Sequence, residues 1–170
     1  MDEGLYKSTL ERMRKLREHA QKISAEKSPE KLPELILFAI KDITNSDGGT
    51  LYLPTEKGLK FEIVVNSKLN IYMGGSSNVR IGFPPIPYTL EDGEPNHKNI
   101  ASSSFNKKQI VCLDDAYDDS TFDLTGIWAF DTKMNYRTKG ILTIPLYNHE
   151  EAVLGVIQMI NPLDDDSTAR

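Results

Sequence analysis

The pattern of apolar and polar positions is clearest between residues 141 and 160. Two apolar runs, residues 141–147 and 152–160, are separated by the polar residues 148–151. This pattern predicts two antiparallel strands joined by a short hairpin loop. Both alternating sets of side chains in the first run are apolar, so the sheet needs a cover on each face. We expect this hairpin at the centre of the sheet, with helices on one face and a pocket wall, residues 131–138, on the other.

The N-terminal segment, residues 5–24, contains neither Gly nor Pro and is rich in Lys, Arg and Glu. It predicts a helix of about five turns. Its apolar and small positions recur at alternating spacings of three and four, as in the seam of a short coiled coil. The helix either packs on its own domain or forms a dimer seam or signalling linker, and we treat residues 1–27 as a separate unit. The seam positions are Tyr6, Thr9, Met13, Leu16, Ala20 and Ile23.

The next segment predicts a second helix followed by two strands. Ser28 and Pro29 are typical of a helix start, and residues 32–44 carry a broad apolar face that predicts packing on the sheet. Residues 45–49 read as a turn. Strands are expected at residues 50–53 and 59–65, joined as a hairpin.

The middle of the chain is less regular. Its glycines and prolines between residues 66 and 96 predict a long loop with a short strand at residues 79–81. Asn96 or Asn99 caps a short helix to about residue 105, followed by a strand at residues 109–113 and a loop or short helix to residue 130. The order of elements predicts an α+β fold, an antiparallel five- or six-stranded sheet with helices on one face and a loop-covered pocket on the other.

The composition excludes several classes of protein. With 170 residues and 39% hydrophobic content, the chain can bury the core of one domain. Its net charge of −5 and lack of a basic run argue against a nucleic-acid partner. We expect no membrane segment and a cytoplasmic location, because no apolar run approaches the roughly 20 residues of a membrane span and no signal peptide precedes the domain.

The chain offers little for catalysis or metal binding. The acidic residues 114–119 lack the glycine and closing glutamate of a calcium loop, so they predict a capped turn and no metal site. His97 is the one histidine near a candidate binding site, where it either contacts a ligand or is simply exposed. The single cysteine, Cys112, excludes an internal disulfide and is expected to be a buried strand residue. With no nucleophile and base in a known arrangement, we expect this fragment to have no catalytic activity.

Four segments together resemble a GAF domain, a fold of the profilin-like or PAS-like type. They are residues 49–53, 110–117, 136–146 and 153–161, and the resemblance covers residues 28–162. The loop at residues 70–87 further resembles GAF domains that precede HD or HD-GYP phosphohydrolase domains in bacterial signalling proteins. The resemblance implies a sensory domain that binds a cyclic nucleotide or another anionic or polar small molecule. It also implies a homodimer formed through the helices, a C-terminal output domain in the full-length protein, and a truncated tail at residues 163–170.

The resemblance also implies positions for the ligand-binding side chains. The chain departs from cyclic-nucleotide-binding members of the family at Met134, at Val65 with Asn66, and at Pro162.

The alternative is a ligandless dimerisation module whose pocket is filled by Met134, Trp128 and Tyr136. A reductase of the GAF type would need catalytic cysteines, and only Cys112 is present. The candidate ligand-binding residues are Thr50, Asn66, Ile100, Ala101, Asp131, Met134, Thr138 and Gln158.

Overall fold

The structure is a computed structural model that describes residues 3–162, and the predicted tail at residues 163–170 lies outside this range. The helices are α1 (Glu3–Ala25), η1 (Pro29–Lys31), α2 (Leu32–Ile43), η2 (Gly75–Ser77), α3 (Ile100–Lys107) and α4 (Thr125–Met134). The strands are β1 (Ser46–Thr55), β2 (Gly58–Asn66), β3 (Ile71–Gly74), β4 (Val111–Leu113), β5 (Ile141–Tyr147) and β6 (Val153–Pro162).

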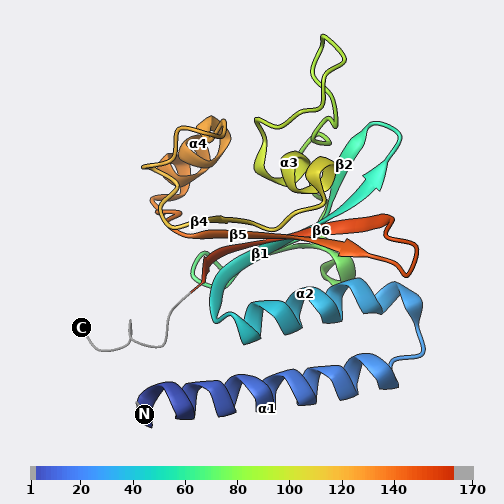
Figure 1. Ribbon diagram of the computed structural model, residues 1–170, viewed down its shortest axis with the longest axis vertical. Coiled ribbons are helices and arrows are strands. Elements are labelled where there is room, and N and C mark those ends of the chain that lie inside the picture. Colours follow the sequence, from blue (N-terminus) through green and yellow to red (C-terminus); the bar gives the residue numbers. More distant parts are fainter. Residues whose placement is uncertain (1–2, 163–170) are drawn as a thin grey trace.

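The six strands form one antiparallel sheet in the order β3-β2-β1-β6-β5-β4. Figure 1 shows α2 against one face of this sheet, with α1 outside α2, and α3, α4 and the long loop on the other face. The predicted α+β class and antiparallel sheet are therefore confirmed. Helices cover both faces, however, because α3 carries its own buried residues Ile100 and Ala101 against the second face.

The centre of the sheet is the pair β1 and β6, and the prediction of a central β5–β6 hairpin is only half right. Strand β1 starts at Ser46, although residues 45–49 read as a turn in the sequence. Gly48 pairs with Asn66 on one side and Ile160 on the other. A Cβ at Gly48 would lie 2.6 Å from the Val65 carbonyl oxygen. Glycine at this position therefore allows β1 and β2 to approach each other closely.

The third strand also differs from the prediction. No strand forms at residues 79–81, and β3 follows β2 directly through a tight turn in which Asn70 has a φ of 52°. Instead, the carbonyl oxygen of Val79 accepts a hydrogen bond from the Gly74 amide at 2.8 Å. An asparagine tolerates this left-handed backbone conformation, and the sequence pattern of alternating residues does not reveal it.

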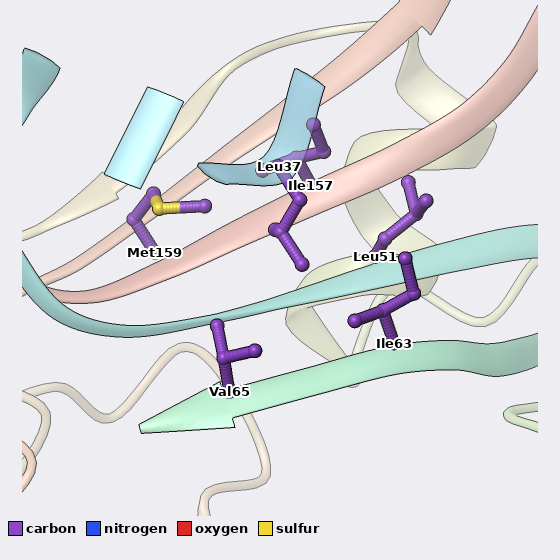
Figure 2. Close-up of a cluster of buried hydrophobic side chains, with 6 residues drawn as sticks. All are labelled: Leu37, Leu51, Ile63, Val65, Ile157 and Met159. Carbon is purple, nitrogen blue, oxygen red and sulfur yellow. The ribbon is translucent and has the colours of Figure 1, made fainter. Parts of the chain in front are cut away.

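The main core lies between α2 and the sheet. Leu37 of α2 is fully buried against side chains of β1, β2 and β6, which Figure 2 shows converging from neighbouring strands. At the sheet edge, Cys112 of β4 is exposed, which corrects the expectation that it is buried. Strand β4 has a neighbour on one side only, β5, and its central side chain faces outward. The buried members of the core are Leu37, Leu51, Ile63, Val65, Ile157 and Met159.

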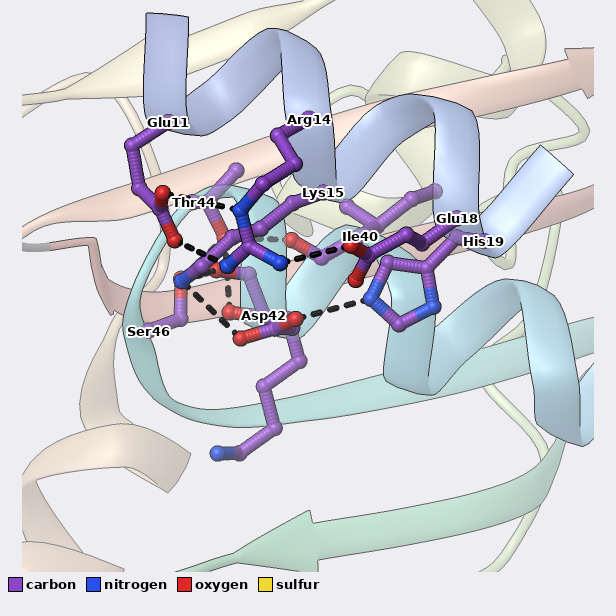
Figure 3. A network of polar contacts seen from close by, with 10 residues as sticks. Glu11, Arg14, Lys15, Glu18, His19, Ile40, Asp42, Thr44 and Ser46 are labelled. Atoms are coloured by element: carbon purple, nitrogen blue, oxygen red, sulfur yellow. Dashed lines mark hydrogen bonds and ion pairs between the residues drawn. The ribbon is translucent and has the colours of Figure 1, made fainter. Parts of the chain in front are cut away.

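Helix α1 lies on α2 and has no extensive contact with the sheet. Lys15 and His19 of α1 both bind the carboxylate of Asp42 in α2 (Figure 3). Among the described residues, no helix is long and apolar enough to cross a membrane.

Candidate ligand-binding site

A cavity of about 650 Å³ lies on the sheet face opposite α2. Its floor is formed by β1, β2 and β6, and its walls by residues 83–90, the start of α3 and one side of α4. Small-molecule sites in proteins commonly have volumes of 300–1,000 Å³. The cavity therefore has the size of a site for one small organic molecule.

Aromatic side chains extend from the floor of the cavity to its loop wall. Tyr52 and Phe61 of the floor lie with ring centroids 4.8 Å apart, and the ring of Phe83 in the loop lies 5.2 Å from that of Phe61. Ile127 and Phe130 of α4 line the other wall. Because aromatic rings offer large apolar surfaces with an electron-rich face, these walls suit a flat, partly apolar ligand.

The floor carries an ordered set of hydrogen bonds. The Tyr52 hydroxyl donates to Gln158 Oε1 at 3.0 Å, and Gln158 Nε2 donates to Thr143 Oγ1 at 3.2 Å. Burial raises the pKa of Tyr52, so its hydroxyl stays a neutral donor. Thr50 pairs with Gln158 across the two central strands and also lines the cavity. The side-chain amide of Gln158 is thus held in one orientation by Tyr52 and Thr143.

One exposed part of the cavity lining, which we call the opening, lies at the N-terminal end of α3. Asn99 caps this helix by accepting a hydrogen bond from the Ser102 amide at 3.1 Å. Lys98 and Asp123 line the opening with their exposed side chains, and the Asp123 amide donates to the Lys98 carbonyl oxygen at 2.8 Å. Hydrogen bonds from Thr125 lower the pKa of Asp123, which therefore remains a carboxylate at neutral pH. The opening combines a cation, a carboxylate and the positive end of a helix.

The loop that forms the upper wall is anchored at its base. Buried Asn96 donates to the Pro87 carbonyl oxygen at 3.0 Å, and the Ser102 hydroxyl donates to the same oxygen at 3.1 Å. Asn106 donates to the Tyr88 carbonyl oxygen at 2.8 Å. These bonds satisfy backbone groups that have no strand partner, so an irregular proline-rich segment can keep a fixed place over the cavity.

Four of the eight predicted ligand-binding residues line the cavity: Thr50, Ile100, Thr138 and Gln158. The other four lie elsewhere. Ala101 packs in a buried apolar cluster with Tyr52, Leu59 and Val156, and Asn66 is buried at the end of β2. Asp131 and Met134 belong to α4, although residues 131–138 read as a polar loop in the sequence.

Asp131 supports the cavity without lining it. Its buried carboxylate accepts hydrogen bonds from the Thr138 amide at 2.7 Å, the Thr138 hydroxyl at 2.9 Å and the Tyr117 hydroxyl at 2.9 Å. Three donors on one carboxylate fix the position of Thr138 against the cavity. We therefore describe Asp131 as a positioning residue for the wall.

Sequence reasoning missed the aromatic residues of the cavity. Tyr52 could have been found from its spacing, because it lies two residues after Thr50 and therefore on the same face of β1. Phe61 and Phe83 carried no such signal, since a β-bulge shifts the register beside Tyr52 and Phe83 lies in the irregular loop. His97 is exposed and does not line the cavity. Within residues 3–162, no three potential metal-ligating side chains are grouped together.

The chain matches no model of a known protein family. It is 29% identical over 133 residues to a cGMP-specific 3',5'-cyclic phosphodiesterase of Drosophila sechellia, a match that covers 74% of this chain and 10% of that protein. The corresponding protein of Drosophila melanogaster has the same identity, with 11% of its length covered. The chain thus spans about a tenth of the length of these curated relatives.

Solved structures show the fold. The GAF domain of a phosphoenolpyruvate-protein phosphotransferase from Coxiella burnetii superposes with a TM-score of 0.62 at 14% identity, covering 93% of this chain and 84% of that one. The free methionine-R-sulfoxide reductase of Neisseria meningitidis, in complex with its substrate, has a TM-score of 0.58 at 12% identity and covers 96% and 81%. The A. aeolicus nlh2 GAF domain has a TM-score of 0.59 at 13% identity, with 95% and 85% covered. The chain therefore has the fold of a GAF domain.

Proposed function

We propose that this chain is a regulatory sensor domain whose cavity binds a small molecule and controls a separate output domain. The observation that carries the proposal is the cavity of about 650 Å³, with aromatic walls and a hydrogen-bonding floor. Such a combination is typical of binding sites and unusual in a surface that only packs against other protein. The first ligand class to test is a cyclic nucleotide.

A flat heterocycle suits the inner part of the cavity. Gln158 and Thr50 offer hydrogen-bonding groups to the edge of such a ring, while Phe61 and Phe130 offer apolar surface to its faces. The Tyr52 hydroxyl holds Gln158 in place at 3.0 Å, so little side-chain entropy is lost when a ligand binds. A base with both donors and acceptors on its edge matches this floor.

An anionic group suits the outer part. The N-terminal end of α3 begins at Ile100, which lines the cavity, and Lys98 adds a positive charge beside it. Helix N-termini favour anions through their amide groups and their dipole. Asp123 at the same opening disfavours a second negative charge, and this supports a singly charged phosphate such as that of a cyclic nucleotide.

The curated relatives add one reason to begin with cGMP, since they are named as cGMP-specific phosphodiesterases. The output domain of the full-length protein, an HD-type phosphohydrolase in a bacterial signalling protein, stays a prediction. So do the expectations that this fragment has no catalytic activity of its own and that it is cytoplasmic.

The ligandless alternative requires the cavity to be filled by Met134, Trp128 and Tyr136. Trp128 is 37% exposed and packs toward Tyr117 on the outer side of α4, with ring centroids 6.0 Å apart. Tyr136 donates its hydroxyl to Asp47 at 2.9 Å. None of the three residues lines the cavity, and this favours the binding function.

Native mass spectrometry of the freshly purified protein, followed by thermal unfolding with cGMP, cAMP and cyclic di-GMP, tests the proposal. A ligand at 100 times its dissociation constant adds about 2.7 kcal/mol to the stability, which raises the melting temperature by several degrees. The variant Gln158→Leu should lose this rise, whereas Gln109→Leu, a change at an exposed position outside the cavity, should keep it. The proposed ligand class would be contradicted if the purified protein carried no bound small molecule and none of the three nucleotides raised its melting temperature.

A further inference from the structure

The cavity floor extends sideways across four strands. Met73 of β3 pairs with Val64 of β2, and Val64 pairs in turn with Thr50 of β1. On its other side, Thr50 pairs with Gln158 of β6. Directly paired residues of an antiparallel sheet share a face, and all four of these side chains line the cavity. Because neighbouring strands lie about 4.8 Å apart, the row from Met73 to Gln158 is about 14 Å long.

The row changes its chemical character between β1 and β2. Thr50 and Gln158 carry a hydroxyl and an amide, which can hydrogen-bond to the edge of a polar ring. Val64 and Met73 offer no strong donor or acceptor, so they contribute only apolar surface. A ring held by Thr50 and Gln158 covers the floor at β1 and β6, and the floor at β2 and β3 stays free for a second group.

The walls of the cavity follow the same division. Every described residue that lines it from β2, from β3 or from the loop at residues 83–90 has an apolar side chain. Of the described lining residues, the two charged ones, Lys98 and Asp123, belong instead to the segments before α3 and α4. We call the part bounded by β2, β3 and residues 83–90 the apolar end. A polar group that enters the apolar end finds no side-chain partner there, which favours an apolar group.

Phe83 covers the apolar end only in part. Its ring lies 5.2 Å from that of Phe61, yet 47% of its surface is exposed. The neighbouring residues Pro84 and Pro85 are exposed as well and also line the cavity. An apolar group placed between this loop and the floor would cover apolar surface that now faces water, and this burial favours binding.

We propose that the apolar end is a second subsite, and that the ligand of this cavity carries an apolar group, a phenyl ring or an alkyl chain of similar size, beside its polar ring. A single molecule is the occupant, because Val64 and Thr50 are direct partners and the two parts of the floor are therefore continuous. The inference rests on the proposed function for the polar ring, whereas the apolar character of β2 and β3 does not depend on it.

Nuclear magnetic resonance of the full chain tests the apolar end without any nucleotide. The methionine methyl groups are isotope-labelled, and toluene is added as the probe. The Met73 methyl resonance should shift, whereas that of Met159, which is fully buried on the opposite face, should not. Met13, which is 63% exposed on α1, controls for attachment of the probe to any exposed methionine and should not shift either. The variant Met73→Gln identifies the Met73 resonance by its absence.

A shift confined to Met73 supports the second subsite. An unmoved Met73 resonance would overturn the inference, since it would mean that Phe83 and the loop already close the apolar end. Equal shifts at Met73 and Met13 would overturn it as well, because toluene would then bind without regard to the cavity.

Dissociation constants for cGMP and for two of its analogues test whether one molecule fills both parts. The analogues 8-phenylthio-cGMP and N2-phenyl-cGMP each carry a phenyl group, which leaves the purine in a different direction. At least one of them should bind the wild-type chain about 10-fold more tightly than cGMP, because the added ring is buried against apolar surface. Met73→Gln keeps the length of the side chain but makes it polar, and it should reduce this advantage to about 3-fold or less. Met13→Gln is the matched control and should keep the full advantage.

The outcomes separate this inference from the proposed function. If cGMP binds and neither analogue binds more tightly, the second subsite is overturned and the sensor function stands. If the advantage survives Met73→Gln, the phenyl group lies elsewhere, and the inference is again overturned. If none of the three nucleotides binds, the proposed ligand class is wrong, and the toluene experiment by itself decides whether the apolar end takes an apolar group.

Discussion

The two faces of the same sheet are covered in different ways. On the α2 face, Leu51 and Ile157 pack against Leu37 and are at most 1% exposed. On the other face, the neighbouring residues Thr50 and Gln158 border a cavity. Because side chains alternate along a strand, one strand supplies the core with every second residue and the candidate site with the others. The main core and the candidate site therefore lie on opposite faces of a single sheet.

The difference arises from the segments that cover each face. Helix α2 presents a continuous apolar side, in which Ile36 and Ile40 accompany Leu37, and it closes over the sheet. The segment over the other face contains Pro84, Pro85 and Pro87, which prevent a helix from forming there. It is held by hydrogen bonds from side chains to its backbone, as in the contact of Asn96 with the Pro87 carbonyl oxygen. A loop of this kind leaves space where a helix would fill it.

Removing a side chain from the closed face should have the largest effect. Leu37→Ala should lower the free energy of unfolding by about 2–5 kcal/mol, because the fully buried site cannot collapse around the missing atoms. Urea denaturation measures this loss. Leu154→Ala, at a leucine that is 52% exposed, is the control and should change the stability by no more than about 0.5 kcal/mol. Equal losses in the two variants would show that α2 does not close the main core.

On the cavity face, the largest effect is expected at Asp131. Asp131→Ala leaves the Thr138 amide, the Thr138 hydroxyl and the Tyr117 hydroxyl without their acceptor, which should cost about 1–3 kcal/mol. Ligand binding should weaken as well, since Thr138 lines the cavity. Thermal unfolding with and without cGMP measures both effects. Asp118→Ala removes an exposed carboxylate nearby and should change neither. Unchanged stability in Asp131→Ala would contradict the positioning role.

Asp47 lies at the start of β1, and its contribution to stability should depend on pH. Burial by itself raises the pKa of this carboxyl group, but hydrogen bonds from Lys68, Asn161 and Tyr136 outweigh burial and hold the pKa below its ordinary value of 3.8. The unfolded chain therefore takes up a proton from about pH 3.8 downward, while the folded chain takes it up only at lower pH. The stability contributed by this carboxylate is fully present above that range and is lost as the pH falls through the folded pKa.

The variant Asp47→Asn tests this pH dependence. It should be less stable than the wild-type chain by about 1–3 kcal/mol at pH 7, because the group buried there loses its charge-assisted hydrogen bonds. Urea midpoints measured between pH 7 and pH 3 should show the difference shrinking at the acidic end. A difference that stays constant over this range would mean that the Asp47 carboxylate is not the titrating group.

The smallest effect is expected at the edge of the sheet. Cys112→Ser should change the stability by no more than about 0.5 kcal/mol, because the side chain is exposed on β4. In the native wild-type protein, this thiol should react with a thiol reagent at nearly the rate found in the unfolded chain. A strongly protected thiol would instead support the burial that the sequence suggested.

The pattern of apolar and polar residues alone was sufficient to predict the elements that are long and regular. Helix α2 and the β5–β6 hairpin lie where their apolar spacing predicts them, within one or two residues at each end. Helix α4 was predicted only as a loop or short helix, since its Gly126 and Thr125 are weak helix formers. Strand β3 was missed because its four residues, Ile71–Gly74, carry too little pattern to be distinguished from the surrounding loop.

The sequence by itself determined the α+β class and the alternation that divides the sheet into two faces. Both follow from periodicity, which is a local property of the chain. Only the tertiary structure decided that Phe61, Phe83 and Phe130 meet around one cavity, and that Asp131 supports the wall from behind. These residues come from a strand, a loop and a helix, so their meeting depends on how the elements pack, and no local spacing encodes it.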